Sequence, residues 1–179
     1  MIVQSGLRLW GMRAGYLGFG LAVILVHLMP GALMPASLPA PDFIMALTFA
    51  WATRRPEYVP SIAIATVVLL ADFLFQRPPG LWAALVVAGA ALLKTRGRFL
   101  RDLPFWVEWL NVAIIILALH LGYRLASSLL MIAQAPLSLT IVQLSGTIVI
   151  YPLVVVLSYA ATGLRKSTPG ELDPTGHRP

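Results

Sequence analysis

The chain has 179 residues, of which 59% are hydrophobic and 11% charged, with a mean hydropathy of +0.84 and a formal net charge of +6. A soluble domain carries about 25% charged residues, so this chain has too little polar surface to cover a globule in water. The absence of cysteine excludes disulfides, thiolate metal sites and cysteine nucleophiles. Basic residues lie at the ends of apolar segments and form no stripe, which argues against nucleic acid as a partner.

Charges and prolines divide the chain into six apolar segments, which predict an all-α membrane protein built as a six-helix bundle. The first, at residues 14–34, is uncharged and as a helix measures about 31 Å, a full hydrocarbon crossing. This run is also compatible with a secretory signal, but it is long for a signal core. The other spans are predicted at residues 40–53, 58–75, 80–93, 104–123 and 136–162.

The connections differ in character. Residues 40–53 are short for a crossing, so we expect a thin or tilted span that its neighbours shield. The segment Arg124 to Ala135 is predicted to be the longest outer connection, and residues 164–179 a disordered cytoplasmic tail. Small residues at 87–93 favour close helix packing.

Lysine and arginine test the topology. With six crossings and a cytoplasmic N-terminus, only Arg77 and Arg124 among those in the loops and span ends lie outside, which agrees with the positive-inside rule. Both termini are therefore predicted to be cytoplasmic. The residues placed inside are Arg8, Arg13, Arg54, Arg55, Lys94, Arg96, Arg98, Arg101, Arg165 and Lys166.

Two acids fall at the predicted outer ends of spans. Asp72 lies in an otherwise uncharged stretch, where a carboxylate is costly, so we expect it to reach the headgroups beside Arg77 or to make a polar contact in the bundle or with a partner. Asp42 follows Pro41 where a helix begins, a position that the helix dipole favours for an acid. One polar network is possible among Asp42, Asp72, Arg77, His120 and Arg124.

The remaining polar residues indicate structural roles. Glu108 and Asn111 share a helix face, and we expect interfacial salt bridges to Arg98 and Arg101. The histidines at 27 and 120 each stand alone on an apolar helix, which predicts hydrogen-bonded burial and no metal site. Polar side chains at 143, 145 and 147 are suited to bonds between helices.

No catalytic motif is present: the sequence has no phosphate-binding loop, no nucleophile elbow and no pair of acids placed to flank a scissile bond. The predicted outer loops are too short for a separate catalytic domain. We therefore expect a protein that is not an enzyme and that needs no cofactor.

The order of three features resembles the MreD family of rod-shape-determining membrane proteins. They are Pro41-Asp42, a short apolar span that ends near Pro56, and the stretch VLLADFLFQRPPG. The family commonly has a proline–aspartate before its second span, and an aspartate in the next span followed eight residues later by a glycine, as in Asp72 and Gly80. Val68 and Gln76 stand where the family pattern has glycine.

This resemblance implies a non-enzymatic scaffold for the complex that directs lateral peptidoglycan synthesis and cell-wall organisation in rod-shaped bacteria. The implied location is the inner (cytoplasmic) membrane, and the implied partners are an MreC-like bitopic protein, RodA, its partner transpeptidase and MreB. The residues implied in partner binding or structural polar contacts are Pro41, Asp42, Asp72, Arg77 and Gly80.

An alternative function remains open. The family is similar in fold to the six-helix substrate-binding subunits of energy-coupling-factor transporters, so the chain could bind a vitamin-type small molecule. Such a binder needs a polar–aromatic outer pocket, and the mostly aliphatic segment Arg124 to Ala135 offers little for it. We therefore favour the scaffold, and we expect Asp72→Leu to weaken partner assembly more than it lowers the protein level in the membrane.

Overall fold

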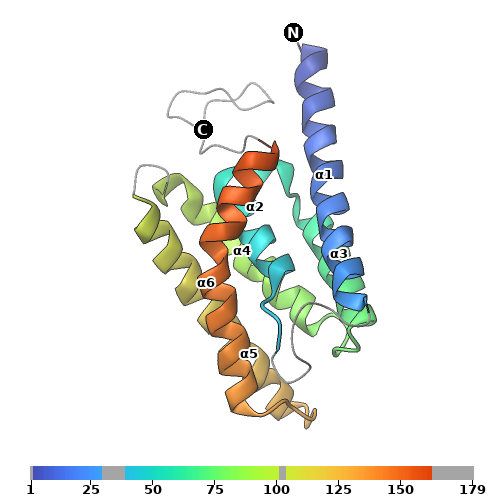
Figure 1. Cartoon of the computed structure of the whole chain (residues 1–179), viewed down its shortest axis with the longest axis vertical. Helices are drawn as coiled ribbons and strands as arrows, with labels where there is room; N and C mark the ends of the chain where they lie inside the picture. The colour runs from blue at the N-terminus through green and yellow to red at the C-terminus, as the bar shows by residue number, and fades with distance from the viewer. Residues whose placement is uncertain (1, 30–38, 101–103, 163–179) are drawn as a thin grey trace.

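The computed structural model describes residues 2–29, 39–100 and 104–162, and within them every regular element is helical (Figure 1). The predicted all-α class is confirmed for this part of the chain. The elements are α1 (Ile2–Leu28), α2 (Phe43–Arg54), the 3₁₀ turn η1 (Pro56–Tyr58), α3 (Ser61–Leu74), α4 (Leu81–Leu100), α5 (Phe105–Leu129) and α6 (Leu137–Thr162).

Within the described ranges, three helical segments are long and apolar enough to cross a membrane: Gly6–Leu28, Phe105–Leu129 and Leu137–Thr162. They keep most of their apolar residues on the outside, where Leu129 is 76% and Val149 72% exposed. A soluble monomer rarely exposes so extensive an apolar surface, whereas a surface in contact with lipid requires one. The structure therefore supports membrane association.

The helices end at different residues from the predicted spans. The first helix begins at Ile2 and ends at Leu28, whereas the predicted span is 14–34. Residues 94–100, predicted to be part of a basic loop, continue α4, because lysine and arginine are good helix formers. The prediction of a disordered tail at 164–179 lies outside the described residues.

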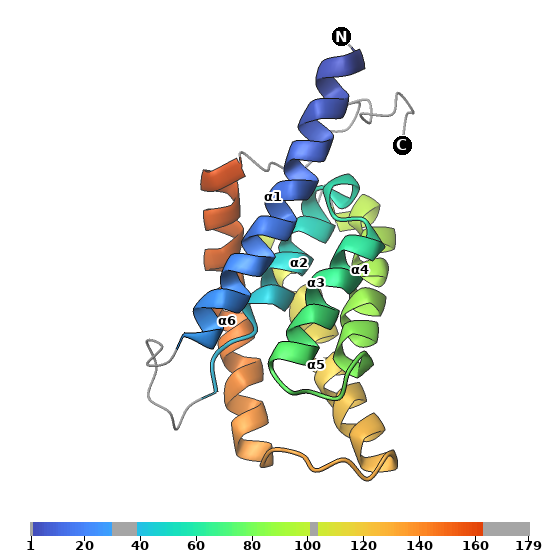
Figure 2. The same cartoon turned by 90° about the vertical axis from the view of Figure 1, so that its right-hand side faces the viewer.

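Helix α2 lies in the middle of the bundle. It packs against α4 and α6, with α1 at its side (Figures 1 and 2), and most of its 12 residues are buried. The hydroxyls of Thr48 and Thr53 donate back to carbonyls of their own helix, at 2.6 Å each. A helix that is apolar on every side belongs in a core, so α2 is shielded by its neighbours as predicted.

Close contact between helices depends on small residues in α4, as predicted. A Cβ atom added at Gly89 would lie 2.8 Å from Leu119 Cδ1 of α5 and 3.0 Å from Phe49 Cζ of α2. Ala90, the next residue, is completely buried. Glycine at this position therefore lets α4 approach both neighbours at once.

Helix α6 contains a proline at residue 152, which has no backbone N–H to donate to the carbonyl of Ile148. That carbonyl instead accepts a hydrogen bond from the indole Nε1 of Trp109 on α5, at 3.0 Å. A tryptophan of α5 thus satisfies the backbone group that Pro152 leaves without its helical donor, and the bond joins the two helices.

Candidate functional site

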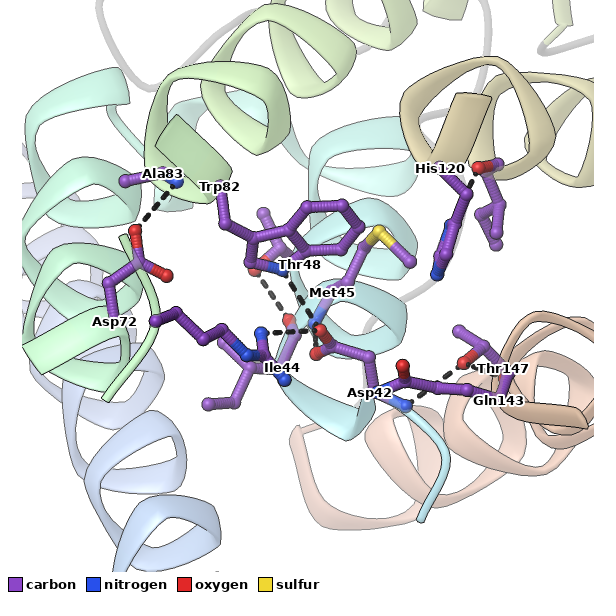
Figure 3. A network of polar contacts seen from close by, with 12 residues as sticks. Asp42, Ile44, Met45, Thr48, Asp72, Trp82, Ala83, His120, Gln143 and Thr147 are labelled. Atoms are coloured by element: carbon purple, nitrogen blue, oxygen red, sulfur yellow. Dashed lines mark hydrogen bonds and ion pairs between the residues drawn. The ribbon is translucent and has the colours of Figure 1, made fainter. Parts of the chain in front are cut away.

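Asp42 is the centre of a polar network at the start of α2 (Figure 3). Its Oδ1 accepts the backbone N–H of Met45 at 2.9 Å, so the side chain caps the helix as predicted. Its Oδ2 accepts the indole N–H of Trp82 at 3.0 Å and lies 3.5 Å from Arg77 Nη1. Its own backbone N–H donates to Thr147 Oγ1 at 2.9 Å. This one residue therefore connects α2 with α4, α6 and the turn that follows α3.

Pro41 lies against α6 beside this network. A Cβ atom added at Gly146 would lie 3.1 Å from Pro41 Cγ, so the missing side chain makes room for the proline ring. The proline–aspartate pair therefore seats the start of α2 on α6, with the proline supplying an apolar contact and the aspartate the polar ones.

Asp72 belongs to α3 but caps the start of the next helix, α4. It is completely buried at the end of α3, and its Oδ2 accepts the backbone N–H of Gly80 at 3.2 Å. It also accepts the backbone N–H of Ala83 at 3.1 Å, at the start of α4 (Figure 3). Gly80 has a φ of +85°, a left-handed conformation that glycine adopts without strain. The spacing of eight residues between aspartate and glycine is thus the length of one α3–turn–α4 connection.

This geometry decides between the contacts predicted for Asp72. Arg77 pairs with Asp42, and the carboxylate of Asp72 turns to α4. Its side chain has no exposed surface, and the hydrogen bonds that the structure shows for Asp72 lie within the bundle.

The turn after α3 forms a helix-terminating Schellman motif. The N–H of Arg77 bonds to the carbonyl of Asp72 at 2.9 Å, and the N–H of Gln76 to that of Phe73 at 3.3 Å. Gln76 occupies the left-handed position with a φ of 54°, where glycine is the usual residue. The motif turns the chain back so that the guanidinium of Arg77 lies 5.8 Å from the ring centre of Trp82.

Beside this network, the same end of the bundle contains a cavity of about 200 Å³. We call it the outer cavity, after the side of the membrane predicted for it. It is formed by α4, α5, α6 and the α5–α6 connection. The polar and aromatic residues around it are Arg77, Trp82, His120, Tyr123, Arg124, Gln134, Thr140 and Gln143.

Aromatic rings and one arginine fix the walls of the outer cavity. The Trp82 ring packs edge to face against His120 and Tyr123, with centroid distances of 5.0 and 5.3 Å. The Nη1 of Arg124 donates to the carbonyl of Ala135 at 3.0 Å and to the hydroxyl of Thr140 at 2.9 Å. Arg124 thereby holds the α5–α6 connection against the start of α6.

The structure gathers the residues of the predicted outer network at one end of the bundle. Arg77 contacts Asp42, while His120 and Arg124 join through the outer cavity. The prediction missed Trp82, which links network and cavity; a buried indole N–H usually needs an acceptor, and that could have indicated it. Two polar side chains of the mostly aliphatic segment 124–135, Arg124 and Gln134, line the cavity.

A second polar cluster lies at the opposite end of α2. Glu108 is buried completely, with Oε1 3.3 Å from Arg54 Nη2 and 3.1 Å from the Tyr151 hydroxyl that donates to it. Glu108 was predicted to form salt bridges at the membrane interface. In the structure it instead connects α2, α5 and α6 inside the bundle. Asn111 accepts a hydrogen bond from Arg96 at 3.4 Å. The side chains of the predicted partners Arg98 and Arg101 lie outside the described residues.

An apolar groove runs along the side of α2 that faces between α1 and α6, with a volume of about 360 Å³. Trp51 lies at its floor and donates its indole N–H to Ser158 at 3.2 Å. Apart from that serine, the walls are hydrophobic: Phe19, Val23, Phe43, Leu47, Val154, Leu157 and Ala161. We refer to it as the α1–α6 groove.

In the described part of the chain, no three histidine, aspartate or glutamate side chains lie close enough together to hold a metal ion. Comparisons of the sequence with protein-family models and with curated proteins, and of the structure with solved structures, found no match.

Proposed function

We propose that the chain is an MreD-like, non-enzymatic scaffold of the bacterial cell-wall elongation complex. In this proposal it spans the inner membrane six times, keeps both termini in the cytoplasm and binds an MreC-like bitopic partner through helix contacts inside the bilayer. The residue pattern of Pro41, Asp42, Asp72 and Gly80 supports the family assignment. The α1–α6 groove is the observation that carries the proposed mode of binding.

The shape and chemistry of the groove suit one apolar helix. Its exposed rims are Phe19 on α1 and Leu157 on α6, at 43% and 57%, and its floor is the buried helix α2. No charged side chain of the described residues lines it, so an apolar helix can enter without desolvating an ion. Helices in membranes associate by close packing and by hydrogen bonds of small polar residues, and Ala161 and Ser158 supply both kinds of surface.

The buried acids support a rigid scaffold rather than a reactive centre. Asp42 and Asp72 both act on helix N-termini at one end of the bundle, and Glu108 ties α2 to α5 and α6 at the other. Each carboxylate is engaged within the bundle, so α2 is held at both ends. A fixed α2 gives the groove a floor of constant shape.

The test fills the groove and measures partner binding. Leu157→Trp places a larger side chain in the groove, and we expect it to reduce co-purification of the MreC-like partner from native membranes severalfold. Ile114→Trp on α5 is the matched control, since Ile114 is 56% exposed and outside the groove. Both variants should reach the membrane at the level of the unmodified chain.

Two results would contradict the proposal. Unchanged recovery of the partner with Leu157→Trp, together with Leu47→Trp at the floor of the groove, would remove the groove as the binding site. Absence of any MreC-like protein among the proteins that co-purify with the unmodified chain would remove the scaffold function itself.

The outer cavity favours a second candidate, a small-molecule-binding subunit of a transporter. Its polar–aromatic lining is the feature that such a subunit requires. The two candidates differ in phenotype: loss of a scaffold changes cell shape, whereas loss of a transport subunit abolishes uptake of one nutrient and leaves rod shape intact. Deletion of the gene in a rod-shaped host, followed by microscopy and growth on limiting vitamins, separates them.

A further inference from the structure

We infer that the outer cavity binds a phosphate group, carried either by a lipid headgroup or by a soluble phosphate ester. The inference goes beyond the scaffold function and does not depend on it, because it uses no residue of the α1–α6 groove. It stands on the charge, the free donors and the size of the cavity.

The cavity carries an excess of positive charge. Arg77 is balanced in part by Asp42, 3.5 Å away. Arg124 has only neutral partners, a carbonyl and a hydroxyl that both bind its Nη1, while its Nη2 and Nε bond to nothing in the described part of the chain. The other nearby acid, Asp72, faces the amides of α4. The remaining donors of Arg124 are therefore available to an anion that enters the cavity.

Neutral donors surround the same space. The hydroxyl of Tyr123 and the side-chain amide of Gln143 line the cavity and make no hydrogen bond to any described residue. The imidazole of His120 is anchored by its Nδ1, which donates to the Ile116 carbonyl at 2.9 Å, and this fixes the ring against Trp82. The guanidinium of an arginine donates several hydrogen bonds in one plane. Together with hydroxyl and amide donors, it matches the several acceptor oxygens of a phosphate.

The volume limits what can enter. Pockets that enclose a whole small-molecule ligand measure about 300–1,000 Å³, whereas this cavity holds about 200 Å³. It reaches the surface beside Ala133 and Ala135, which are both exposed. A compact headgroup can therefore enter while the rest of a larger molecule stays outside. This size argues against complete enclosure of a vitamin.

The experiment uses the full chain purified in a neutral detergent, with two probes. Native mass spectrometry measures retention of phosphatidylglycerol against phosphatidylcholine, whose choline cation the arginines repel. A thermal shift titration with glycerol 3-phosphate tests the soluble source. We expect Arg124→Gln to weaken binding of the retained probe at least about tenfold, the loss typical for a hydrogen bond to a charged group.

Two further variants make the result decisive. Gln143→Leu removes a donor without breaking any side-chain hydrogen bond to a described residue, so it should fold even where Arg124→Gln does not, and it should weaken binding severalfold. Arg96→Gln at the other end of α4 is the control and should leave binding unchanged. Preference for phosphatidylglycerol identifies a headgroup site, and binding of glycerol 3-phosphate identifies a soluble ester. Binding of neither probe, or binding that Gln143→Leu leaves unaltered, overturns the inference.

Discussion

Asp42 and Asp72 both supply acceptors for backbone N–H groups at the start of a helix, but from different positions in the chain. Asp42 caps its own helix, whereas Asp72 reaches across a turn to cap the next one. Each places a negative charge at the positive end of a helix dipole and accepts buried amide N–H groups. The sequence could predict that Asp72 needs a polar contact, because an acid in an apolar stretch is costly. It could not predict the acceptor geometry, which depends on how α3 turns into α4.

Replacement of Asp72 is therefore a test of stability. Asp72→Leu leaves the part-buried amide of Gly80 and the buried amide of Ala83 without their acceptor, and an unsatisfied buried group costs about 1–3 kcal/mol. We expect a lower melting temperature in detergent and less protein in the membrane, in addition to any effect on partner assembly. Asp72→Asn keeps an acceptor oxygen and should lose less.

Thr66→Leu is the matched control for this measurement. Thr66 is exposed on the same helix, and its hydroxyl bonds only to the carbonyl of Ile62. Its replacement should change the melting temperature little. A melt of Asp72→Leu that coincides with that of the unmodified chain would show that the cap contributes nothing.

At the scale of elements, a side chain of α5 replaces a backbone hydrogen bond that α6 lacks. Pro152 frees the carbonyl of Ile148, and Trp109 of α5 binds it. Apolar runs in the sequence predicted that both helices exist. Their ends and this contact were not predictable, since charged residues do not stop a helix and the indole partner lies 39 residues away.

A double-mutant cycle tests the compensation. Trp109→Phe should destabilise the chain by about 1–3 kcal/mol, because it leaves a backbone carbonyl without a donor. In a Pro152→Ala background residue 152 regains an N–H for that carbonyl, so the same tryptophan substitution should cost less. Equal losses in both backgrounds, measured by chemical or thermal unfolding in detergent, would disprove the compensation.

At the scale of the whole molecule, orientation in the membrane is the prediction that most others depend on. The natural chain has no cysteine, so single cysteines report their side without background. Met131→Cys in the α5–α6 connection replaces a side chain that is 94% exposed, and Thr95→Cys lies in the last part of α4. We expect an impermeant thiol reagent to label position 131 in intact cells and position 95 only after lysis.

Labelling of position 95 from outside would reverse the orientation, and with it the side assigned to the outer cavity. The distribution of lysine and arginine predicts this orientation, since the positive-inside rule needs only counting along the chain. From the sequence, His120 and Arg124 could be placed only on the same side of the membrane. The cavity that they both line is created by the packing of α4, α5 and α6, which the sequence did not reveal.

The burial of α2 has a consequence for biosynthesis. This short helix is synthesised before α4 and α6, the neighbours that enclose it. The backbone N–H of Asp42 finds its acceptor, the hydroxyl of Thr147, only 105 residues later in the chain. Until α6 arrives, the nascent protein holds a 12-residue helix that is too short to cross the hydrocarbon unaided. The packing around α2 therefore becomes complete only when the last helix, α6, has been synthesised.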